Sequence, residues 1–169
     1  NLFGQKIKEN IIDEFTGHAK TTTDVIWFSN ATRFNSYCRF VRIDSVCYAN
    51  LRLSINGKVI AVEDGGKLML KLANDSIITL YNNEYSVSRK GNASFGFMGS
   101  GVEGVNLFFP IPTEYYPILT TRKIIKIRLY TTGGYADQEI GDGAAVAFLD
   151  TFKLLLETKP LAGEKKSTF

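Results

Sequence analysis

The chain has 169 residues, which suits one domain, and folding would bury roughly 70 % of the surface of the extended chain. Apolar residues make up 44 % and charged residues 22 %, so the composition is that of a globular protein rather than a disordered one. The net charge of +3 is too small to indicate nucleic-acid binding. One histidine and two cysteines exclude a histidine-rich metal centre and a disulfide scaffold, and we expect no metal or cofactor.

The N-terminal segment predicts a hairpin. Residues 11–15 and 22–28 read as strands, with a turn at Gly17 and His18. Residues 1–5 have neither a charged region nor an apolar core, so they are not a signal peptide, although they fit what remains after one is cleaved. No run of about 18 apolar residues occurs, and we expect no transmembrane segment.

Residues 36–46 alternate with a period of two, which indicates a strand. Tyr37, Arg39, Val41 and Ile43 share one face, and Cys38, Phe40 and Arg42 share the other. A reversal at Asp44 and Ser45 would place Cys38 opposite roughly Leu51, not opposite Cys47. We therefore expect two separate, buried thiols rather than a disulfide.

The following strands are joined by short turns. Asn56-Gly57 separates residues 48–55 from 58–63 and is a strong hairpin signal. Asn, Asp and Gly turns then separate three further strands at 67–72, 76–81 and 85–89. Residues 105–109, ended by Pro110 and Pro112, and residues 123–130 are the last predicted strands. This order predicts an antiparallel meander.

A helix closes the chain. Apolar residues recur at intervals of three and four at Ala145, Phe148, Leu149, Phe152, Leu155 and Leu156. They predict a helix over about 143–159, with Asp142 or Gly143 as N-cap and Pro160 beyond its end. The expected fold is α+β and mostly β: a twisted sheet or flattened sandwich with the helix on a sheet face. Residues 1–160 would form the single domain and 161–169 a flexible tail.

Two connections are the candidate binding segments. Residues 99–104 spell G-x-G-x-x-G, but β-branched residues, aromatics and two prolines follow, so the helix of a dinucleotide site cannot form there. We interpret the segment as a surface loop, with Gly99, Ser100 and Gly101 as binding candidates. Tyr115 and Tyr116 are the second candidates, because flat rings in a connection can stack on sugar rings.

No assembled catalytic set is apparent. His18 is the single imidazole and is expected in an exposed turn. Paired carboxylates, Asp13 with Glu14 or Asp137 with Glu139, could serve a glycosidase-like hydrolase but look the same as surface charges. The basic stripe of Arg122, Lys123, Lys126 and Arg128 is interpreted as a solvated sheet face, not a nucleic-acid site.

The order of short segments resembles a loose group of small, uncharacterised exported proteins from gut-dwelling Bacteroidetes-type bacteria. The segments are 13–17 before a threonine-rich run, 66–72 with 76–80, 116–119, and 124–129 before the closing helix. This resemblance implies export to the periplasm or the cell surface. It transfers no catalytic residues.

The sequence thus favours a non-enzymatic exported domain that binds a protein or glycan partner, or plays a structural role. The alternatives are a carboxylate-dependent, glycosidase-like hydrolase acting at strand ends and, as a third class, a cytosolic module with reduced thiols. Two carboxyl groups about 5–9.5 Å apart in a cleft would favour the hydrolase, and a shallow aromatic patch would favour binding.

Overall fold

The computed structural model describes residues 5–31, 34–55, 58–90 and 103–162. Its larger sheet is antiparallel in every described pairing. The strand order is β1 (Ile7–Ile12), β2 (Ala19–Thr23), β4 (Phe34–Ile43), β5 (Val46–Ile55), β11 (Glu103–Ile111) and β10 (Arg89–Lys90), with β3 (Ile26–Ala31) also paired to β4. A turn that includes Gly17, with a φ of 74°, joins β1 to β2 as predicted. The two strands lie at residues 7–12 and 19–23 rather than at 11–15 and 22–28, and β3 pairs with β4 instead.

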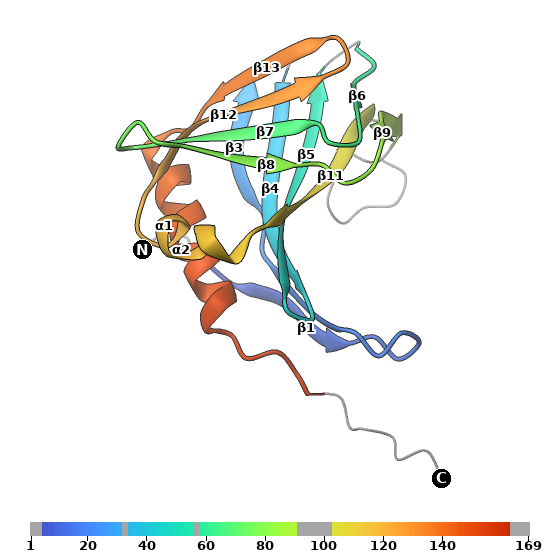
Figure 1. Cartoon of the computed structure of the whole chain (residues 1–169), viewed down its shortest axis with the longest axis vertical. Helices are drawn as coiled ribbons and strands as arrows, with labels where there is room; N and C mark the ends of the chain where they lie inside the picture. Colours follow the sequence, from blue (N-terminus) through green and yellow to red (C-terminus); the bar gives the residue numbers. More distant parts are fainter. Residues whose placement is uncertain (1–4, 32–33, 56–57, 91–102, 163–169) are drawn as a thin grey trace.

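A smaller sheet crosses in front of the larger one (Figure 1). Its order is β13 (Gly134–Glu139), β12 (Ile124–Thr131), β7 (Lys67–Leu72) and β8 (Ile77–Tyr81), and a two-stranded sheet pairs β6 (Ala61–Val62) with β9 (Ser86–Val87). These pairings are also antiparallel. The expected mostly-β, antiparallel architecture is therefore confirmed.

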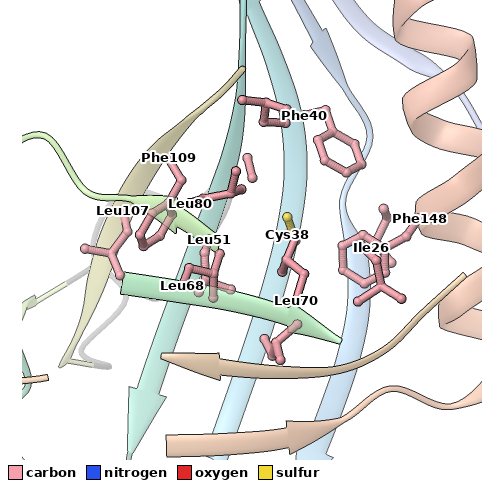
Figure 2. Packing of buried hydrophobic residues seen from close by; sticks show 14 of the residues in the cluster. Ile26, Cys38, Phe40, Leu51, Leu68, Leu70, Leu80, Leu107, Phe109 and Phe148 are labelled. Atoms are coloured by element: carbon pink, nitrogen blue, oxygen red, sulfur yellow. The ribbon is translucent and has the colours of Figure 1, made fainter. Parts of the chain in front are cut away.

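The core lies between the two sheets. Alternation turns Leu51, Leu107 and Phe109 of the larger sheet inward, where each is at most 2 % exposed. Figure 2 shows these side chains with Leu68, Leu70 and Leu80 of the smaller sheet. Burying each such side chain contributes about 1.5–3 kcal/mol to stability.

Helix α2 (Asp142–Glu157) packs against β2, β3 and β4 of the larger sheet and against β12. Phe148 lies 5.4 Å from Phe28, and Phe152 lies 5.0 Å from Phe40, measured between ring centroids. The predicted C-terminal helix is confirmed. Its N-cap is Gly141 rather than the predicted Asp142 or Gly143, and the Asp142 carboxylate pairs with Lys123 at 2.9 Å. Among the described residues, no helix is long and apolar enough to cross a membrane.

The predicted hairpin across Asn56 and Gly57 is wrong. Those two residues lie outside the described part, but β5 pairs with β4 and β11, and β6 pairs with β9. The local hairpin is replaced by a long-range strand pairing. Strand β11 aligns seven residues with β5 and buries four apolar side chains, which outweighs the local turn preference of Asn-Gly.

The strand at 123–130 is not the last one, because β13 follows it and pairs with β12. Strand β13 has no buried residue, so it lacks the apolar alternation by which strands are recognised. The strand β11 also continues through Pro110 to Ile111 instead of ending at Pro110. Residues 163–169 of the expected tail lie outside the described part.

Candidate functional site: a polar face of the larger sheet

The predicted binding residues fall in two places. Gly99, Ser100 and Gly101 lie outside the described residues. Tyr115 ends a short 3-10 helix, η1 (Thr113–Tyr115), and Tyr116 begins α1 (Tyr116–Leu119); both pack partly buried against the core. The Tyr116 ring meets Phe152 at 5.4 Å, edge to face, and burial raises its pKa to about 12. Their role in binding stays a prediction.

The predicted basic stripe is matched by acidic residues of the neighbouring strand. Arg128 donates from Nε and Nη2 to both carboxylate oxygens of Asp137 at 2.6 and 2.7 Å, and its guanidinium carbon lies 3.9 Å from the Tyr135 ring centroid. Lys126 pairs with Glu139 at 3.1 Å. The outer face of the smaller sheet thus carries cross-strand ion pairs.

Asp137 and Asp13, two of the carboxylates that the sequence suggested for hydrolysis, are stabilised in their charged form. Hydrogen bonds from Arg128 lower the pKa of Asp137, and backbone N–H groups of Thr16 and Phe15 lower that of Asp13. A glycosidase-like general acid needs a raised pKa. His18 Nδ1 lies 2.6 Å from Asp44 Oδ2, with both side chains more than half exposed. Within the described ranges, no group of three or more His, Cys, Asp or Glu could hold a metal ion.

A different set of residues gathers on the face of the larger sheet that is turned away from the core. Cross-strand register sets Trp27, Tyr37, Arg52 and Asn106 opposite one another on β3, β4, β5 and β11. The adjacent row consists of Arg39, Asn50 and Phe108. We call these seven residues the arginine face.

Two asparagines join the two arginines. Arg39 Nε donates to Asn50 Oδ1 at 2.9 Å, and Arg52 Nε donates to Asn106 Oδ1 at 3.2 Å. Asn50 Nδ2 donates to Asn106 Oδ1 at 2.6 Å and to the carbonyl oxygen of Leu107 at 3.0 Å. Asn50 is fully buried, so its rotamer is fixed and it orients both neighbours.

The surroundings of Arg39 and Arg52 disfavour the charged form of both guanidinium groups. Burial lowers the pKa of Arg39, although the carboxylate of Glu9 acts in the opposite direction. Burial and the positive charge of Arg39 together lower the pKa of Arg52 to about 10. Arg39 and Arg52 are diagonal neighbours on adjacent strands, so their Cα atoms lie about 7–8 Å apart.

Aromatic pairs lie on both sides of the arginines. Trp27 is 64 % exposed and meets Tyr37 edge to face, with ring centroids 4.0 Å apart. On the other side, Tyr48 meets Phe108 at 6.4 Å, also edge to face. The two arginines are therefore bordered by aromatic pairs on both sides along the sheet face.

The arginine face was not among the sites predicted from the sequence. Its signals were the placement of Tyr37 and Arg39 on one strand face and the reversal at Asp44 and Ser45, which sets Arg39 opposite Asn50. Comparisons with protein-family models, curated proteins and solved structures found no match.

Proposed function

We propose that this chain is a non-enzymatic binding domain that acts outside the cytoplasm and binds its ligand on the arginine face. The observation that carries the proposal is the asparagine link that holds Arg39 and Arg52 side by side. Guanidiniums fixed before binding lose little conformational entropy when a ligand arrives, which favours affinity and specificity.

A merely structural role accounts less well for these residues. Partial burial of the two guanidiniums removes water from charged groups, and apolar or threonine side chains would cover a sheet face without that cost. Such locally unfavourable arrangements are concentrated at functional sites. The arginines are therefore better explained by what they bind than by what they stabilise.

The hydrolase alternative gains no support from the carboxylates that the sequence singled out. Asp137 is held by Arg128, and Asp13 closes its own turn by accepting from Phe15 and Thr16. Export is supported by the resemblance of the sequence alone. Fractionation of the native host should recover the chain outside the cytoplasm, and recovery with cytosolic markers would contradict this part of the proposal.

The test is a screen of the full chain on arrays of glycans and peptides. The variant Arg39→Gln with Arg52→Gln should lose the binding that the wild type shows. A matched control, Arg122→Gln with Lys153→Gln, removes two exposed cations elsewhere and should retain it. Circular dichroism and thermal unfolding establish that all three chains fold. Equal binding by the wild type and the arginine-face variant would overturn the assignment of the site.

A further inference from the structure

We infer that the ligand of the arginine face is an acidic glycan, with a carboxylate or sulfate group between Arg39 and Arg52 and a sugar ring against Trp27. This inference rests on the proposed function and names its ligand class. It is carried by the contiguity of the fixed guanidiniums with an exposed aromatic ring.

The arginines account for the acidic group. A guanidinium is planar and presents parallel N–H donors to carboxylate, sulfate or phosphate oxygens. Both arginines are held through Nε, so Asn50 and Asn106 set the orientation of each guanidinium plane. An oxyanion that reached both would accept hydrogen bonds in a partly desolvated place, where such bonds are strong.

The aromatic pair accounts for the ring. Trp27, Tyr37 and Arg52 form one row across the adjacent strands β3, β4 and β5, because Trp27 is opposite Tyr37 and Tyr37 is opposite Arg52. The Tyr37 ring packs against the indole at 84° with ring centroids 4.0 Å apart, and this contact restrains the Trp27 side chain although it is 64 % exposed. A flat, exposed, immobilised ring provides an apolar surface for the C–H groups of a sugar.

Other ligand classes fit less well. Single-stranded nucleic acid requires a track of cations along its backbone, whereas this face holds two fixed arginines and the chain carries a net charge of only +3. Lys20, on the neighbouring strand β2, is paired with Glu9 at 3.2 Å.

The experiment is calorimetric titration of the full chain with four probes: oligogalacturonate, sulfated dextran oligomers, uncharged dextran oligomers and oligodeoxythymidine. We expect binding of oligogalacturonate or sulfated dextran, weakened by added NaCl, and none of uncharged dextran. Arg52→Gln should weaken binding about tenfold or more, because it removes charge-assisted hydrogen bonds. Arg52→Lys should have an affinity between those of the wild type and Arg52→Gln. Trp27→Ala should also weaken binding, and Arg122→Gln should leave it unchanged.

A second measurement needs no substitution. Titration of the acidic probe into the wild-type chain should shift the NMR signals of the Nε–H groups of Arg39 and Arg52 and of the Trp27 indole N–H, while the Arg128 signal stays in place. This readout tests the inference even if Arg52→Gln fails to fold.

The outcomes separate the inference from the proposed function. Binding of uncharged dextran that is lost in Trp27→Ala but kept in Arg52→Gln would overturn the acidic class and leave the arginine face as the binding site. Preferential binding of oligodeoxythymidine would overturn the glycan class. Acidic binding that Arg52→Gln and Trp27→Ala both leave intact would overturn the inference and the assigned site together.

Discussion

Arg42 Nη1, on strand β4, donates a 3.0 Å hydrogen bond to the carbonyl oxygen of Leu155 near the C-terminal end of helix α2. Its Nη2 donates to the carbonyl oxygen of Thr158 at 2.6 Å and to Thr21 Oγ1 at 3.2 Å. The side chain is only 8 % exposed. A buried cation therefore satisfies carbonyl groups that a helix end leaves without intrahelical partners, and it lies at the negative end of the helix dipole.

We predict that Arg42→Met lowers the free energy of unfolding by about 3 kcal/mol, since hydrogen bonds to charged groups contribute about 1.5–3 kcal/mol each. Methionine keeps the apolar volume but leaves the carbonyl oxygens of Leu155 and Thr158 without this donor. Urea unfolding followed by circular dichroism measures the change. Arg122→Met, at an exposed arginine, should change stability by about 0.5 kcal/mol at most. A loss below about 1 kcal/mol for Arg42→Met would mean that the helix end is anchored by packing alone.

The helix should also depend on Phe152, which is 1 % exposed and contacts the rings of Phe40 and Tyr116. Phe152→Ala should destabilise the fold by about 3–5 kcal/mol, the range for deleting a large core side chain. The adjacent Lys153 is exposed, so Lys153→Ala is the matched control and should be close to neutral. Denaturant unfolding gives both values. Similar stabilities for the two variants would show that α2 does not contribute to the core as described.

Alternation and turn residues predicted strand pairings between segments that are neighbours in the sequence. The reversal at Asp44 and Ser45 was inferred from alternation, and the structure pairs Cys38 with Leu51 as expected. Both cysteines are free and buried. Strand β13 was missed because its outward residues are Tyr135, Asp137 and Glu139 and its inward ones are small or polar. Its place therefore depends on contacts with Lys126 and Arg128 of β12 rather than on apolar alternation.

The arginine face could be predicted only in part. The inferred register around Asp44 already implies that Arg39 faces Asn50 and that Tyr37 faces Arg52. Asn106 is more than 50 residues further along the chain, and no local signal says that β11 rather than residues 58–63 occupies the second edge of β5. Non-local strand pairing is decided by the total apolar burial, which one sequence does not reveal.

The two thiols provide a test of core integrity. Burial raises the pKa of Cys38 to about 12 and also raises the pKa of Cys47. Because the thiolate is the reactive form, neither thiol should react appreciably with Ellman's reagent at about pH 8 in the native state. In 6 M guanidinium chloride, about the concentration that unfolds most domains, both should react. Rapid native reaction of one or both thiols would contradict their burial.

The ion pair between Arg128 and Asp137 should make stability depend on acid pH. Arg128 lowers the pKa of Asp137 below the ordinary value of 3.8 in the folded state. The folded state therefore holds the charged carboxylate more tightly than the unfolded state does. The stability that this gives is fully present above the unfolded pKa and is lost as the pH falls through the lower, folded pKa.

The expected result is that Asp137→Asn is less stable than the wild type at neutral pH, and that the difference shrinks below about pH 4 as the wild-type carboxylate becomes protonated. Urea unfolding at several pH values measures it. Asp64→Asn, at an exposed turn residue before β7, is the matched control and should follow the wild-type pH profile. Because the pair is on the surface, added salt should also reduce the difference at neutral pH. A difference that stayed constant from neutral to acid pH would mean that Asp137 acts through its shape and hydrogen bonding, not through its charge.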